Sequence, residues 1–254
     1  MARAAKHLKA IKRSIAAYGA KRPYRIVKAK VKKTKNLSIL KPPDDIAVLA
    51  GEMIYQMRSA LDHLAFELVK HNSASLPTNW EETCEFPLRT RPPRHGKPPV
   101  PYSPPAPLSE FSRQLPGVPI TALTFIETLQ PYYGTPAVNN FLGVLAKLSN
   151  IDKHRYLNVV SGKARQSQTV RYRSGFSMRS VETLDHGAEL PPETGINKSD
   201  RAVYVNRRFR PFVTFGEPSI GGFNAYALDY LLQLILENIE AVVVPALHKF
   251  IKKP

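Results

Sequence analysis

The chain has 254 residues, 43% of them hydrophobic, and carries a formal net charge of +17. This length is enough to bury a sizeable core, and no apolar run approaches the roughly 20 residues needed to cross a bilayer. The single cysteine, Cys84, has no partner in the chain for a disulfide, and the N-terminus lacks the apolar core of a signal peptide. We therefore expect a cytoplasmic protein with no transmembrane segment.

The positive charge is concentrated near the N-terminus. The first 43 residues hold 14 of the 37 Lys and Arg residues, and no Asp or Glu precedes Asp44. Such a segment attracts nucleic acid or an anionic membrane surface, although a solvated basic arm without a specific ligand is equally common. If the partner is RNA or another polyanion, the candidate binding residues are Lys6, Lys9, Lys12, Arg13, Lys28 and Lys30.

Two elements are expected within this basic segment. Residues 1–18 predict an amphipathic helix whose apolar side holds Ala4, Leu8, Ile11 and Ile15. An acid-free basic helix is also typical of an organelle transit peptide or of a helix lying on a membrane surface. Alternation over residues 24–31 predicts a short edge strand. We therefore divide the chain into a basic N-terminal helix and edge strand, 1–43, and a single domain, 44–254.

A long helix predicted for residues 44–71 organises the second part. Apolar residues recur in it at spacings of three and four, the period of a helix that buries one stripe. They are Met53, Met57, Ala60, Leu61, Leu64 and Leu68. The preceding Pro42-Pro43 cannot lie inside a helix, whereas Asp44-Asp45 can cap its N-terminus and complement its dipole.

Two further long helices are predicted, one from Pro136 and one from Asn224, with Pro245 kinking or ending the latter. Residues 72–117 form a proline-rich excursion, for which a structural loop and a polyproline ligand are the alternatives. Short runs with strand character between residues 157 and 216 predict a small antiparallel sheet. The expected fold is α+β but mainly α: a bundle of three long helices with a small antiparallel sheet.

The segment RSALDH, residues 58–63, carries the most chemically suggestive side chains. Arg58 and Asp62 are four residues apart and can form an ion pair on one side of the helix. His63 lies about 140° around the helix from Arg58, because each residue advances about 100°. A site that joins Arg58 to His63 therefore needs a second helix or a second subunit, and a homodimer is one such arrangement.

The second predicted helix ends in NIDKHRYL, residues 150–157, which repeats this chemistry. Asp152 falls inside the apolar stripe, where an ionised carboxylate is costly unless it is paired. We therefore expect Asp152 to meet a cation across the contact between the two helices, with Arg58 as the best candidate. Arg155 lies on the flank beside Asp152, and His154 points largely away from the stripe.

Three explanations of these residues remain open. They can form a buried polar network that fixes the register of the helices. Alternatively, arginine charge and a histidine that titrates near neutral pH can act on a phosphodiester, as in ribonucleolytic cleavage. Asp62, His63, Asp152 and His154 also include metal-ligand types, but the chain has no HExxH, Glu-x-x-His or cysteine cluster. We therefore expect no metal and no cofactor.

Four ordered motifs carry a resemblance to a known group of proteins. They are GEMIYQMRSALDHLAFELV, CEFPL, IETLQPYY and LSNIDKHRYLNVV, and they span residues 24–160 together with their flanks. In this combination the chain resembles a widespread family of uncharacterised bacterial proteins. That family has no assigned activity, so this resemblance implies membership without a function.

The spacing of Arg58 and His63 also resembles the signature of the HEPN superfamily, helical proteins that often cleave RNA as dimers. Their signature is an arginine followed after four to six residues by a histidine on a helix; Ser59 stands where they carry Asn, Asp or His. The resemblance implies a metal-independent endoribonuclease in which Arg58 and His63 form a catalytic pair across a dimer. Asp62, Asp152, His154 and Arg155 would support this pair. The alternative is a non-catalytic helical interaction protein.

Overall fold

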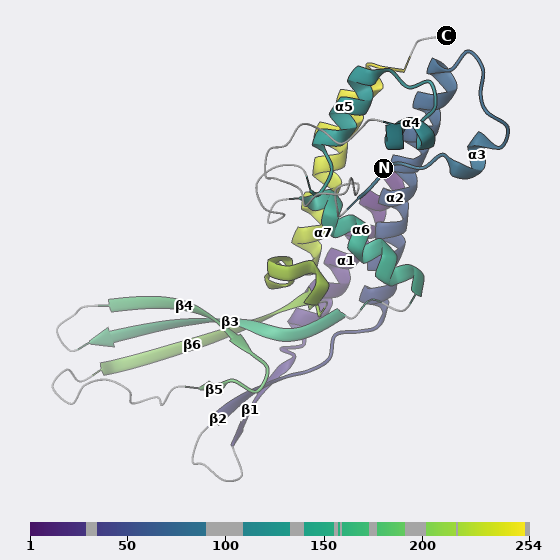
Figure 1. The fold of residues 1–254 in the computed structure, drawn as a ribbon. Helices are drawn as coiled ribbons and strands as arrows, with labels where there is room; N and C mark the ends of the chain where they lie inside the picture. Colours follow the sequence, from purple (N-terminus) through teal and green to yellow (C-terminus); the bar gives the residue numbers. More distant parts are fainter. Residues whose placement is uncertain are drawn as a thin grey trace, which may run out of the picture.

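The computed structural model describes residues 1–28, 35–89, 109–132, 140–154, 157, 159–172, 177–190, 202–216 and 218–251. Helices form one end of the molecule, and two β-sheets extend from the other end (Figure 1). The helices are α1 (Ala2–Ala20), α2 (Asp45–Asn72), α3 (Trp80–Thr83), α4 (Ser109–Gln114), α5 (Ile120–Thr128), α6 (Phe141–His154), the 3-10 helix η2 (Pro218–Ala225), α7 (Leu228–Asn238), the π-helical η3 (Ile239–Val243) and α8 (Val244–His248). The strands are β1 (Tyr24–Lys28), β2 (Lys35–Ile39), β3 (Val159–Tyr172), β4 (Ser177–Asp185), β5 (Glu189–Leu190) and β6 (Ala202–Phe215).

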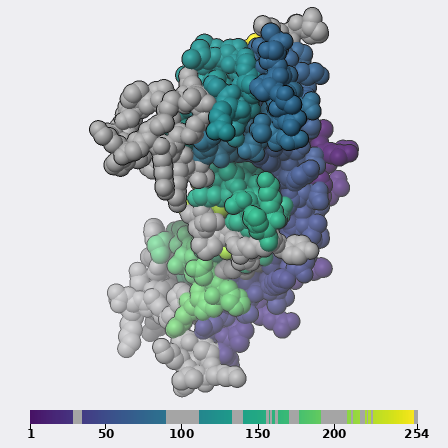
Figure 2. Space-filling model, turned by 45° about the vertical axis from the view of Figure 1, so that its right-hand side comes forward, coloured from purple at the N-terminus to yellow at the C-terminus, as the bar shows by residue number. Residues whose placement is uncertain are grey.

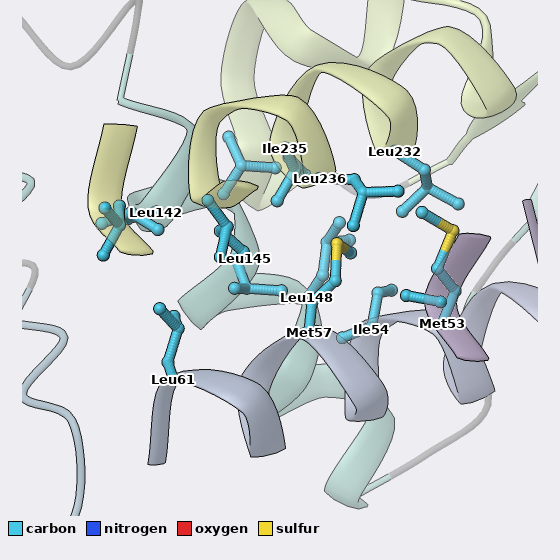
Figure 3. Packing of buried hydrophobic residues seen from close by; sticks show 14 of the residues in the cluster. Met53, Ile54, Met57, Leu61, Leu142, Leu145, Leu148, Leu232, Ile235 and Leu236 are labelled. Carbon is cyan, nitrogen blue, oxygen red and sulfur yellow. The ribbon is translucent and has the colours of Figure 1, made fainter. Parts of the chain in front are cut away.

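Helix α2 forms the centre of the main core. It begins at Asp45, one residue after the two prolines, and its predicted apolar stripe is buried except for Ala60, which is partly exposed. Figure 3 shows side chains of α2 pointing toward those of α6 and α7. Met53, Met57, Leu61, Leu145, Leu148, Leu232 and Ile235 are fully buried in this contact.

Helix α1 is part of the same core, since it packs against α2 and α7. Ala4, Leu8, Ile11 and Tyr18 are buried on its inner side. Its basic residues lie on the opposite, solvent-exposed side. They include Lys6, Lys9, Lys12 and Arg13. The amphipathic pattern thus buries the apolar side of α1 within the protein and leaves its charges outside.

The last long helix begins at Leu228 and is interrupted by the π-helical η3 immediately before Pro245. Proline lacks the N–H for a helical hydrogen bond, so an irregular turn next to it is expected. Residues Leu228–His248 are long and apolar enough to cross a membrane by length and composition alone. Many of their apolar side chains are instead buried in the main core, including Leu228, Leu231, Ile239, Val243 and Leu247.

The strands form two antiparallel sheets of three strands each. The small sheet has the order β1-β2-β5, and the long sheet has the order β4-β3-β6. A second, smaller core joins the two sheets. It consists of Leu37, Ile39, Ala164, Leu184, Leu190 and Phe209.

The predicted bundle of three long helices with a small antiparallel sheet is wrong. The fold is α+β, but α1 and the short helix α5 are also part of the main core, and β3 and β6 each run for 14 residues in a sheet separate from the N-terminal one. The sequence predicts short strands here because glycine and proline, found at Gly162 and Pro211, usually mark the ends of strands. Gly162 lies at a shift of register between β3 and β6, and Pro211 lies in the edge strand β6, which are the positions where sheets tolerate these residues. The predicted start of the second helix at Pro136 lies outside the described residues.

The main core provides a first prediction. Leu145→Ala should lower the free energy of unfolding by about 2–5 kcal/mol, because it removes a fully buried side chain between α2 and α7. Leu40→Ala is the matched control, since this leucine is 45% exposed and should lose less than about 1 kcal/mol. Urea unfolding followed by circular dichroism measures both values, and equal losses would contradict this description of the core.

Candidate functional site

Arg58 connects α2 to the segment of residues 84–89. Its Nη2 atom lies 3.0 Å from Asp62 Oδ1 on the same helix and 3.4 Å from Glu85 Oε2. Asp62 Oδ1 also accepts a hydrogen bond from the backbone N–H of Phe86, at 2.9 Å. The side chain of Arg58 is only 14% exposed. Its charge is therefore matched by two carboxylates that hold the segment on α2.

Gln130 holds the other side of the same segment. Its buried Nε2 donates to the carbonyl oxygens of Pro87 and Ile126, both at 2.9 Å, and its Oε1 accepts from the N–H of Arg89 at 2.9 Å. Three buried polar groups are satisfied in this way, which makes the amide costly to replace. The CEFPL and IETLQPYY motifs of the sequence therefore meet in space.

An open cleft of about 700 Å³ borders this segment. Its lining residues are Glu82, Thr83, Glu85, Arg89, Arg113 and Gln114. Gln114 links two of them, because its Nε2 donates to Glu85 Oε1 and its Oε1 accepts from Arg89 Nη2, both at 3.2 Å. The surface of the short helices beside α2 is visible at the upper end of Figure 2. Three of the six lining residues, Glu85, Arg89 and Gln114, are thus joined by hydrogen bonds.

His63 does not share this site with Arg58. The imidazole side chain is exposed on α2, whereas the side chain of Arg58 is mostly buried and paired, and neither residue lines the cleft. His154 is also exposed, at the end of α6. Within one chain, the mostly buried Arg58 and the exposed His63 therefore have different environments.

Asp152 lies in the contact between α6 and α2, as the sequence predicts, but it does not pair with Arg58. Its carboxylate is packed against Gly51, where an added Cβ would come within 2.6 Å of Oδ1. Burial raises the pKa of Asp152, and the nearby Glu52 raises it further. Among the described residues no cation pairs with Asp152, and Arg58 is bound to Asp62 and Glu85 instead. Arg155 and Lys30 lie outside the described residues.

Glu85, Gln114 and Gln130 were missed by the sequence analysis. Glu85 and Gln114 belong to short, irregular or proline-flanked segments that show no period, so nothing local indicates their partners. Gln130 gives one signal, a polar side chain that directly follows the mainly apolar turns of α5. The regular geometry of a helix cannot predict that this amide bonds to Pro87, which lies 43 residues earlier in the chain.

Cys84 and the acidic side chains offer little further chemistry. Burial, reinforced by Asp62 and then Glu85, raises the pKa of the Cys84 thiol to about 11, so the thiol stays protonated near neutral pH. Within the described ranges, no three His, Cys, Asp or Glu side chains gather closely enough to hold a metal ion.

No family model, curated protein or solved structure matches the chain. The resemblances to the bacterial family and to the HEPN superfamily therefore stay predictions.

The Arg58 network predicts different effects for the two residues of the suspected pair. Arg58→Ala should lower the free energy of unfolding by about 1–3 kcal/mol, because the guanidinium is mostly buried while both carboxylates reach solvent. His63→Ala should change it by no more than about 0.5 kcal/mol, since the side chain is exposed. Chemical denaturation measures both, and a similar loss in the two variants would count against this assignment.

Asp152 predicts a pH-dependent stability. Because its pKa is raised, the folded protein binds this proton more tightly than the unfolded chain, so stability falls as pH rises from the ordinary pKa of 3.8 through the raised value. Asp152→Asn should therefore be more stable than the wild type at neutral pH, and the difference should vanish below pH 3.8. Glu81→Gln, at an exposed position, should show no such gain. Denaturation over a pH series tests the sign.

Proposed function

We propose that the protein binds RNA without cleaving it. The observation that carries this proposal is the distribution of exposed charge. Four basic side chains lie on the outer side of α1, and the first 43 residues contain no carboxylate side chain to neutralise them. These exposed residues are Lys6, Lys9, Lys12 and Arg13. A field of this kind attracts polyanions, and the HEPN resemblance favours RNA among them.

The site around Arg58 supports binding in preference to cleavage. To stabilise a phosphorane, Arg58 would have to leave Asp62 and Glu85 and reach solvent. If a second subunit brought its His63 to this site, the histidine would face a guanidinium that is already paired and mostly buried. An arrangement in which carboxylates pair with Arg58 suits a structural role, because moving this mostly buried guanidinium away from both of them would break its ion pairs.

Incubation of the purified protein with a labelled RNA pool in EDTA tests this proposal. The RNA should shift in a native gel and remain full length, and His63→Ala should bind it as the wild type does. Cleavage that is lost in folded His63→Ala and Arg58→Ala variants would instead establish a metal-independent nuclease. Absence of any shift at low salt would reject RNA binding.

A further inference from the structure

The antiparallel register of the long sheet divides its side chains between two faces. Residues that lie directly opposite each other in neighbouring strands share a face, and the face alternates along each strand. Arg165 lies opposite Arg210 and Thr183, Ser167 opposite Arg208, and Thr169 opposite Arg179. One face therefore carries Arg165, Arg179, Arg208 and Arg210, and we call it the arginine face.

The small sheet covers part of the other face. Ala164, Leu184 and Phe209 belong to that face by the same register, and they pack against Leu37 and Ile39 of β2. The four arginines point away from this contact, and all four are exposed. Because the long sheet extends outward from the helices (Figure 1), it presents an extended ribbon on which these side chains lie.

The arginine face is electrostatically unbalanced. Arg165 and Arg210 are directly opposite each other, an arrangement of like charges that destabilises a sheet. Within the three strands, the only carboxylate on this face is Asp185, and its Oδ1 accepts from Lys163 Nζ at 2.9 Å. Within the described part of the three strands, this face therefore carries four exposed arginines in addition to the paired Lys163, and no second carboxylate lies among them.

The arginines are spaced so that they can contact an extended anionic chain. They occupy three successive rows, which span about 13 Å because each row is two residues from the next. Arg165 lies over the ring of Phe212, 5.9 Å from its centroid, and Arg179 Nε donates to Ser167 Oγ at 3.3 Å. These contacts help hold two guanidinium groups on the face, and each group can form paired hydrogen bonds to phosphate oxygens.

We propose that the arginine face binds the phosphate backbone of nucleic acid. This inference rests on the proposed function and names its binding surface. A backbone offers regularly spaced charges along one direction, as the rows of the sheet do, and phosphate contacts do not require base recognition. The surface therefore takes nucleic acid with little sequence preference and with an affinity that falls steeply with salt.

This surface differs from the one indicated by the sequence. The exposed charges of α1 are mostly lysines on a curved helix surface, and Lys12 Nζ already donates to Gln233 Oε1 at 2.6 Å. Arginine in a flat array gives a more defined phosphate contact than lysine, which acts as a point charge. The long sheet should therefore contribute most of the affinity, and α1 should contribute general attraction.

Two variants that remove equal charge distinguish these surfaces. The sheet variant combines Arg165→Gln, Arg208→Gln and Arg210→Gln, and the helix variant combines Lys6→Gln, Lys9→Gln and Arg13→Gln. Their Kd values for a labelled single-stranded RNA and for a DNA duplex are measured by fluorescence anisotropy between about 50 and 200 mM salt. Phosphatidylserine vesicles serve as a membrane probe, and circular dichroism with urea unfolding reports the fold.

We expect the sheet variant to bind both nucleic acids at least about tenfold more weakly than the wild type. The slope of log K against log salt should lose about 2 to 3, since each phosphate contact contributes roughly 0.7–0.9. The helix variant should lose less than about threefold, because non-specific attraction remains. The sheet variant should also be at least as stable as the wild type, because like-charge repulsion is relieved.

The results that would contradict the arginine face can be distinguished from those that would contradict RNA binding itself. If wild type binds RNA and the folded sheet variant binds it equally, the arginine face is not the surface, although RNA binding stands. If the helix variant alone loses binding, the basic helix is the surface. Lack of RNA binding by the wild type rejects both proposals, and a sheet variant that loses only vesicle binding assigns the face to membranes. If the triple variant fails to fold, Arg208→Gln alone should still lower the slope by roughly 0.7–0.9.

Discussion

Burial of one apolar stripe along α2 is the constraint on which the rest of the structure depends. Helices α1, α6 and α7 cover the stripe. This packing determines where the polar side chains of α2 lie. Arg58 lies at the edge of the stripe, next to residues 84–89, where Glu85 is one of its two ion-pair partners. His63 is directed to solvent instead. Helix packing therefore determines which side chains of the RSALDH segment are paired and which are exposed.

Parts of this arrangement follow from sequence patterns because they are local. Two prolines set the start of α2, and the angle between Arg58 and His63 follows from helical geometry. The position of Asp152 against α2 was predictable because a carboxylate interrupts an apolar period. That Arg58 does not pair with Asp152 was not predictable, because Arg58 binds Glu85, which lies in a segment without periodicity. The long strands were not predicted because glycine and proline usually mark the ends of strands. Gly162 and Pro211 are tolerated within β3 and β6 because of how these distant strands pair, which the local sequence does not show.

The two basic surfaces have different origins. On α1, positive charge is the outer side of an amphipathic helix, and its inner side belongs to the core. On the long sheet, facing arginines oppose folding, so their presence needs a compensating role. In our proposal an anionic ligand supplies that compensation, whereas Arg58 already pairs with Asp62 and Glu85 within the chain. The proposed binding without cleavage is consistent with both features.

The most direct test is hydrogen–deuterium exchange of the protein in EDTA with and without RNA, followed by analysis of the recovered RNA. Our account predicts slower exchange in β3, β4 and β6, unchanged exchange around Arg58 and His63, and intact RNA. Protection centred on α2, accompanied by cleaved RNA, would contradict it.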